Sequence, residues 1–182
     1  KSKGNSITTN KVIDREYLNF FPIVFINQVL DKNNDINISY SRRIDRPSYD
    51  ALNPFVYFLD QYTYNQGNPF LNPQYTNNFE FTYLLKKKYS VTLNYSRTTD
   101  VITEVLLPDN EKQALYQTNE NIATQNAYSL VLNAPVQFVK WWNSNNSLNI
   151  FHIGFKAPDL AGQKLDNKST SFQFKSQHTF NI

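Results

Sequence analysis

The 182-residue chain contains no cysteine, which excludes disulfide bonds, thiolate zinc sites and cysteine nucleophiles. It has only 4 glycines and 2 histidines, and no apolar run approaches the ~20 residues that a membrane-spanning helix requires. Residues 1–30 lack the basic, apolar and small-residue segments of a signal peptide. The compartment stays open, because a β-barrel crosses a membrane with short alternating strands that a search for long apolar runs overlooks.

Charge and aromatic content narrow the class further. The 18 basic and 15 acidic residues are spread along the chain and give a net charge of +3, which gives little support to a nucleic-acid partner because such a partner favours a concentrated basic face. Aromatic residues make up 15% of the chain, with 14 Phe and 12 Tyr. A chain this aromatic and this polar suits an interface better than a dry core.

The segment GNPFLNPQYTNNFEFTY, residues 67–83, passes from a turn rich in Gly and Pro into strict alternation of apolar and polar residues. Similar alternation predicts strands over Phe21 to Leu30, Asp35 to Arg43, Thr76 to Leu85, Tyr89 towards Leu107, Tyr128 to Ala134, Ser147 to Phe155, and Phe172 to Phe180. Tight polar turns are expected at Asp31–Asn34, Lys86–Lys88 and Trp142–Asn146. Long connections are expected at Ile44–Tyr75, from Pro108, and at Lys156–Lys168. The sequence therefore predicts an all-β, antiparallel up-and-down meander of about seven strands.

The composition of the two strand faces favours a membrane barrel over a soluble one. One face is aromatic and aliphatic, and the other is rich in Asn, Ser, Thr and Gln with few charges, as expected for a wet, enclosed lumen. Tyr40, Tyr95 and Trp141 lie near predicted strand ends, where aromatic girdles meet lipid headgroups. The strand at 147–155 has ambiguous parity, because Leu148 and Ile150 alternate out of phase with Phe151, Ile153 and Phe155.

Two motifs carry a resemblance to a known family. SYSRRIDRPSYDALNPF, residues 39–55, is followed by the Gly-Asn-Pro-x-Leu-x-Pro pattern of Gly67, Asn68, Pro69, Leu71 and Pro73. Together they closely resemble the barrel of TonB-dependent outer-membrane receptors, in particular the Bacteroidetes outer-membrane β-barrel family, over residues 39–97. Gln74 departs from the pattern, since family members commonly have Glu there.

The resemblance implies that residues 1–182 are one segment of a larger transmembrane barrel in the outer membrane, without the plug domain and the remaining strands. It implies uptake of a scarce nutrient, with outer-membrane lipid, the protein's own plug domain and the TonB complex as partners. It implies no enzymatic activity and no cofactor. In that setting the motif at 67–73 ends an extracellular loop and directs the chain back into the bilayer.

Strand parity suggests roles for four charged residues. Arg42 and Arg97 lie one step beyond Tyr40 and Tyr95 on the apolar face, where they are candidates to contact lipid headgroup phosphates or are solvated strand ends. Arg43 and Glu80 have the opposite parity and are candidates to face the lumen, in contact with plug or substrate or in a structural pair. His152 and His178 each stand alone in a strand pattern, so we predict no metal or catalytic site from them.

Two alternatives remain open at this stage. A complete small outer-membrane barrel with a structural or adhesin role would use Ser6 to Ile13 as an eighth strand. A soluble lipid-binding barrel would point the aromatic face inward. Under the fragment interpretation, by contrast, the sheet should be open with its two edge strands apart.

Overall fold

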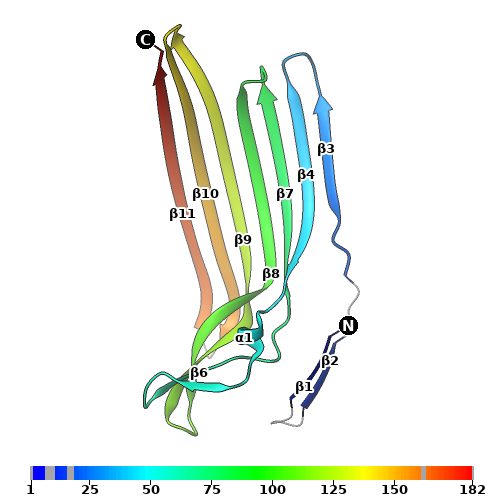
Figure 1. Cartoon of the computed structure of the whole chain (residues 1–182), viewed down its shortest axis with the longest axis vertical. Helices are drawn as coiled ribbons and strands as arrows, with labels where there is room; N and C mark the ends of the chain where they lie inside the picture. The colour runs from blue at the N-terminus through cyan, green and yellow to red at the C-terminus, as the bar shows by residue number, and fades with distance from the viewer. Residues whose placement is uncertain (1, 7–10, 16–18, 161–162, 182) are drawn as a thin grey trace.

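The computed structural model describes residues 2–6, 11–15, 19–160 and 163–181. Its main feature is a curved antiparallel meander in which neighbours in sequence are neighbours in the sheet (Figure 1). In spatial order the strands are β11 (Gln163–Phe180), β10 (Trp142–Leu160), β9 (Ala114–Val139), β8 (Tyr89–Asp109), β7 (Gln74–Leu85), β4 (Asp35–Asp45) and β3 (Ile23–Val29). The expected seven-strand meander is confirmed.

The sheet is open. Within the described part of the chain, β3 and β11 lie at opposite edges and do not pair with each other. The expectation of an unclosed sheet is therefore confirmed, and each edge strand presents backbone N–H and C=O groups that a further strand would satisfy. β1 (Ser2–Ser6) and β2 (Lys11–Arg15) pair only with each other, as a separate two-stranded sheet. The eighth strand expected over Ser6 to Ile13 is thus wrong for the residues described there, and residues 7–10 of that stretch lie outside the described residues.

The register aligns apolar side chains in rows across the whole sheet. One row runs through all seven strands and consists of Ile26, Ile38, Phe81, Leu93, Leu130, Ile150 and Phe172. Six of these seven side chains are among the exposed large hydrophobic residues, with Leu93 at 50% and Phe172 at 80% exposure. A row of exposed aliphatic and aromatic side chains on one side of a sheet requires an apolar environment, and we call this side the apolar face.

Register also resolves the ambiguous parity of β10. Ile150 pairs with Leu130 and Phe172, and Leu148 pairs with Leu132 and Phe174, so these two residues belong to the apolar face. Phe151 then lies on the opposite, polar face, between Ser129 and Ser171. The polar face elsewhere carries Ser39, Glu80 and Asn94 in one row.

One end of the meander is built from tight hairpin turns, as the sequence predicts at 31–34 and 86–88. Lys86 and Lys87 both have positive φ, at 52° and 48°, the backbone of a type I′ turn that normally selects Asn and Gly. The neighbouring turn supports them, since the Lys87 amide donates to the Asn33 carbonyl at 2.8 Å. The turn expected at Trp142–Asn146 is wrong: Lys140 and Trp141 form the turn, and the polar run beyond it pairs with both neighbours inside β10.

The other end is longer and more structured than the sequence predicts. The connection at 44–75 contains a single helical turn, α1 (Tyr49–Leu52), and the short strands β5 (Val56–Phe58) and β6 (Thr63–Gln66). β8 and β9 extend past the loop as one hairpin whose turn is Asn110–Gln113, so Pro108 and Asp109 are strand residues rather than turn residues. The loop expected at Lys156–Lys168 is wrong, because β10 and β11 stay paired to Leu160 and Gln163, and residues 161–162 lie outside the described residues. No helix in the described ranges has the length and apolarity needed to cross a membrane.

Candidate functional site

The connection between β4 and β7 folds back on itself through the two sequence motifs. The amide of Gly67 donates to the carbonyl of Asn53 at 2.9 Å, and the amide of Asn68 donates to the carbonyl of Ala51 at 2.7 Å. Ser48 begins α1 as its N-cap, with the side-chain oxygen accepting from the Ala51 amide at 3.2 Å. The motif at 67–73 therefore holds the end of α1 as well as ending the loop.

Gly67 is required at this junction by close approach of backbone. A Cβ atom at position 67 would lie 2.7 Å from the Asp50 carbonyl oxygen and 2.8 Å from that of Ala51, and closer still to that of Asn53. Three backbone carbonyls surround the position, so no flexible side chain is available to yield. Only glycine allows the two segments to meet in this way.

Asparagine side chains fasten the same motif to the β8–β9 hairpin. Asn68 Nδ2 donates to the Asn119 carbonyl at 3.1 Å. Asn121 accepts from the Asn72 amide at 2.7 Å and donates to the Asn72 and Asp100 carbonyls. Asp100 has a positive φ of 55° and lies where the pairing of β8 with β9 shifts register. Leu71, 1% exposed, is buried at this junction, which makes the motif a small core that anchors the loop.

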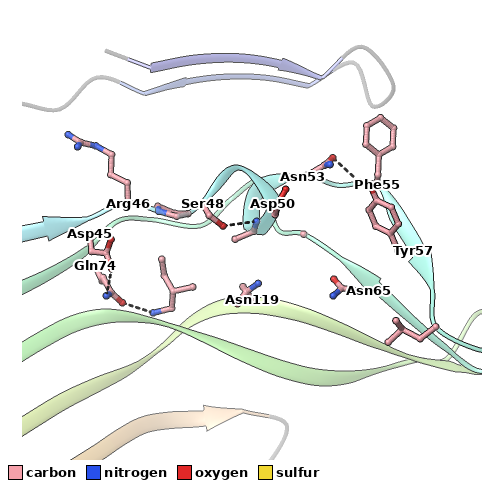
Figure 2. Close-up of a pocket in the computed structure, with 15 residues that line it drawn as sticks. Asp45, Arg46, Ser48, Asp50, Asn53, Phe55, Tyr57, Asn65, Gln74 and Asn119 are labelled. Carbon is pink, nitrogen blue, oxygen red and sulfur yellow. Dashed lines mark hydrogen bonds between the residues drawn. The ribbon is translucent and has the colours of Figure 1, made fainter.

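Gln74 bridges a carboxylate and a backbone amide. Its Nε2 donates to Asp45 Oδ2 at 2.9 Å, while its Oε1 accepts from the Ile102 amide at 3.1 Å (Figure 2). A glutamate could accept from Ile102, but it has no proton to donate to an ionised Asp45. Gln74 therefore serves both partners at once, which a glutamate could not do.

These segments enclose a pocket of about 730 Å³ at the loop end of the sheet. Asp45 and Gln74 are paired residues with the parity of Arg43 and Thr76, so the pocket lies on the polar face. Figure 2 shows Phe55 and Tyr57 side by side at one end of it, with Asp45 and Gln74 at the other. The remaining lining is mostly polar or loop backbone: Arg46, Pro47, Ser48, Asp50, Ala51, Asn53, Leu59, Asn65, Gly67, Ile102 and Asn119.

The pocket combines two kinds of contact. Phe55 and Tyr57 are 60% and 63% exposed and offer aromatic surfaces to a ligand, while the carboxamides and carboxylates offer hydrogen-bond donors and acceptors. Such a combination of aromatic surface and a few polar groups is typical of binding sites. The described residues contain no group of three or more His, Asp or Glu side chains that could hold a metal ion.

A second network holds the wall of the pocket in place. β6 pairs in parallel with β9, from Thr63 opposite Leu115 to Asn65 opposite Gln117. Tyr64, 3% exposed, donates from its hydroxyl to Asp109 Oδ2 at 2.6 Å, and Lys112 Nζ lies 3.3 Å from both groups. The Tyr64 ring stacks on Tyr116 with centroids 5.6 Å apart. The buried ring thus joins the loop to the β8–β9 hairpin.

Electrostatics in this network follow from the same contacts. The hydrogen bond from Tyr64, and then the backbone amide of Lys112, hold the pKa of the Asp109 carboxyl below its usual value. Burial raises the pKa of the Tyr64 hydroxyl, and its bond to Asp109 raises that pKa further. The hydrogen bond with Tyr64 and then the contact with Asp109 raise the pKa of Lys112. All three groups keep their ordinary charge states near neutral pH.

The four charged residues singled out from the sequence lie on two faces. Arg43 and Glu80 lie on the polar face, opposite Thr76 and opposite Ser39 and Asn94 respectively, and neither forms an ion pair with another described residue. Arg42 and Arg97 lie on the apolar face in one row, on either side of Asn77. The structure does not bring Arg43 or Glu80 into the pocket.

The sequence singled out Gly67 and Gln74 among the residues that line the pocket, and residues 45–55 only as part of a motif, and it predicted a pocket from none of them. Asp45 and Asp50 lie in a long connection without a spacing that would mark a site, and the exposed pair Phe55 and Tyr57 has no regular period in the sequence. The available signal was the two motifs themselves, because both fall in one connection and therefore predict that its halves meet. His152 packs by its ring near Tyr128 and His178 contacts Trp142, so each histidine belongs to a strand surface.

Comparison with solved structures shows similarity to two receptor barrels. The siderophore receptor PirA from Pseudomonas aeruginosa superposes with a TM-score of 0.61 at 14% identity, covering 88% of this chain and 34% of that one. A mutant of the ferric enterobactin receptor PfeA from the same organism, in complex with enterobactin, superposes with a TM-score of 0.58 at 13% identity, covering 90% and 33%. The chain therefore spans about a third of each receptor.

A search of curated protein sequences finds no match to this chain. The model of the outer membrane protein beta-barrel family, however, matches residues 1–182. The alternative of a soluble barrel with its aromatic face inward is therefore wrong. The apolar row is exposed because, in an outer-membrane barrel, that face meets lipid. The chain forms an open, seven-strand antiparallel sheet and matches the family model along its whole length, so it belongs to the outer membrane protein beta-barrel family.

Proposed function

We propose that the chain forms part of the barrel of a TonB-dependent receptor that takes up a scarce nutrient across the outer membrane. The observation that carries the proposal is the superposition of the sheet on about a third of two siderophore receptor barrels. In this proposal the apolar face meets lipid, the polar face lines the lumen, and the end bearing the 44–75 connection is extracellular.

The height of the apolar face supports the assignment to lipid. His152 lies on β10 in the aromatic row of Tyr95 and Tyr128, and Trp142 lies on the same strand near the hairpin turns. Ten residues separate them, which is about 34 Å of strand. A tilt of about 40° reduces this to about 26 Å, close to the ~25 Å apolar band of outer-membrane barrels. Trp141, Trp142 and Phe180 cluster at one limit, and Tyr40, Phe79, Tyr95 and Tyr128 form a continuous aromatic row at the other.

The pocket at the extracellular end is the proposed place of substrate contact. It lies on the proposed lumen side and is reached from the loop end, where a nutrient would arrive. Arg43 and Glu80 lie deeper on the same face, exposed and without ion-pair partners among the described residues, where we propose that they face the plug domain or the passing substrate. Transport in this proposal requires that plug and the TonB complex.

Uptake is tested in cells that carry or lack the intact protein. Labelled nutrients of several classes, including ferric chelates, cobalamin and oligosaccharides, are supplied at limiting concentration with and without an uncoupler of the proton gradient. We expect one class to accumulate only when both the protein and the gradient are present. Import that is indifferent to the uncoupler would identify a passive pore instead, and the absence of any protein-dependent class would reject a role in uptake.

Two tyrosines of the same connection give a matched test of the pocket. Tyr57 lines it and Tyr62 does not, although the two side chains are similarly exposed at 63% and 69%. Tyr57→Ala should weaken binding of the identified nutrient by about tenfold, the range expected when one aromatic contact is removed, and Tyr62→Ala should leave it unchanged. Equal effects of the two substitutions would move substrate contact away from the pocket.

A further inference from the structure

A row of hydrogen-bond donors borders the apolar face at its extracellular limit. Arg42, Asn77 and Arg97 are register partners on three adjacent strands, β4, β7 and β8. Two strand spacings place the backbones of the arginines about 10 Å apart, within reach of the two long side chains from either side of Asn77. In the apolar row immediately below are Tyr40, Phe79 and Tyr95.

The tyrosines orient the asparagines of this row. Tyr40 donates from its hydroxyl to Asn77 Oδ1 at 2.9 Å, and Tyr95 donates to Asn126 Oδ1 at 3.0 Å. With its oxygen engaged by a donor, Asn77 has its two amide protons left to offer. The space between the arginines is thus bordered by donors from all three residues.

Neither arginine is neutralised within the described part of the chain. Arg42 stacks its guanidinium over Tyr75 at 5.2 Å, away from the apolar rows, and its Nε is buried without a hydrogen-bond partner. The ion pairs among the described residues, Lys112 with Asp109 and Lys168 with Asp166, include neither arginine. An unpaired guanidinium that leans towards the interface is the arrangement by which arginine meets an anionic headgroup.

An apolar groove of about 750 Å³ lies directly below the donor row. Its lining includes Tyr40, Phe79, Leu93, Tyr95, Leu130 and Ile150, from five adjacent strands. The groove suits a hydrocarbon chain, and the donor row above it suits the two or three oxygens of a phosphate. The two features are one above the other in the same strands, as the two ends of a lipid would be.

We propose that Arg42, Asn77 and Arg97 bind the phosphate of a phosphorylated outer-leaflet lipid, with an acyl chain of that lipid in the groove. The site lies on the outside of the barrel, on the face opposite the substrate pocket. It rests on the assignment of the apolar face to lipid and is independent of the uptake proposal. Its function would be to fix the depth and orientation of these strands in the membrane.

The test uses the intact protein purified from outer membranes, exchanged into neutral phosphatidylcholine nanodiscs, and titrated with phosphatidic acid as the probe. Native mass spectrometry counts the lipids retained. Asn77→Asp replaces the central donor by a carboxylate that repels phosphate while nearly preserving shape. Asn78→Asp is the matched control, because Asn78 is the adjacent residue, lies on the polar face, and accepts through Oδ1 from Asn94 Nδ2 at 3.2 Å, which a carboxylate can also do.

We expect Asn77→Asp to weaken retention of phosphatidic acid by about tenfold or more, the effect of losing a charge-assisted contact, and Asn78→Asp to leave it unchanged. Heat-modifiable gel mobility confirms that both variants are folded, and the double variant R42Q/R97Q should match Asn77→Asp. Equal retention by the two aspartate variants, or equal retention of phosphatidylcholine and phosphatidic acid by the unaltered protein, would overturn the proposal. Full displacement of the lipid by millimolar inorganic phosphate would also overturn it, because the acyl chain would then contribute nothing.

Discussion

Replacing Gly67 by alanine tests whether the two motifs of the 44–75 connection hold each other in place. The added methyl group would lie 2.7 Å from the Asp50 carbonyl oxygen and 2.8 Å from that of Ala51, well inside the contact distance of carbon and oxygen. The backbone must separate, which breaks the hydrogen bonds from Gly67 and Asn68. Two such bonds contribute about 2 kcal/mol, and keeping them with the clash would cost about 1–3 kcal/mol. The connection should therefore be destabilised by about 2 kcal/mol.

The assay is hydrogen exchange of the intact protein in nanodiscs, followed by mass spectrometry of peptides that span 44–75. A local destabilisation of about 2 kcal/mol corresponds to exchange about thirtyfold faster for the amides of Gly67 and Asn68. Gly154→Ala is the control, since a Cβ there would lie 3.5 Å from Lys168 Cγ and 4.0 Å from the Asn167 carbonyl oxygen, both ordinary contacts. If Gly67→Ala leaves exchange in this connection as slow as Gly154→Ala does, close approach is not why glycine occupies position 67.

Three further predictions concern charge. Gln74→Glu removes the donor to Asp45 and places two carboxylates together at neutral pH, so the Ile102 amide, which Gln74 Oε1 holds, should lose protection from hydrogen exchange as the two carboxylates repel each other; unchanged protection would contradict the bridge. The pKa of Asp109 is lowered in the folded protein, so its stabilising effect is present above the unfolded value of about 3.9 and is lost as pH falls through the lower folded value. Protection of the 56–66 segment from exchange should thus be constant from pH 8 to 5 and decline only below about pH 4; decline already at pH 6 would point to another group. Leu93→Arg, on the apolar face one row inside its proposed extracellular limit, should impair folding into bilayers by less than the ~2–4 kcal/mol of an arginine at the midplane, but still by more than Asn94→Arg on the polar face; the reverse order would exchange the two faces.

The strands of the middle of the sheet could be predicted because one physical rule determines them. Over residues 36–40, 79–83 and 89–95, in β4, β7 and β8, the apolar residues alternate without interruption. The turns at 31–34 and 86–88, which precede β4 and join β7 to β8, are short and polar. A half-apolar strand has a period of two, which the sequence displays directly. β10 shows where the rule fails, because Phe151 and Ile150 are both apolar and only pairing with Leu130 decides which one belongs to the apolar face.

Polar composition misled the turn predictions for a related reason. Asn143 to Asn146 read as a turn because Asn and Ser favour turns in water, yet each of these residues pairs with a residue of β9 and a residue of β11. A polar side chain does not prevent its backbone from pairing, so composition alone does not end the strand. The same applies to β8 and β9, whose polar extensions pair with each other well beyond the apolar band.

The pocket shows why a motif can be found in a sequence while the site it builds cannot. Gly67 is required by a close approach of backbone, and Leu71 by a buried position at 1% exposure. Such steric requirements leave a regular pattern in the sequence. Phe55 and Tyr57 are 60% and 63% exposed, so no packing requirement gives them a regular pattern in the sequence. The glycine motif at 67–73 thus determines where the pocket is. Under the proposed uptake function the residues that line the pocket select the ligand, so receptors with that motif and a different residue at position 57 should bind different nutrients.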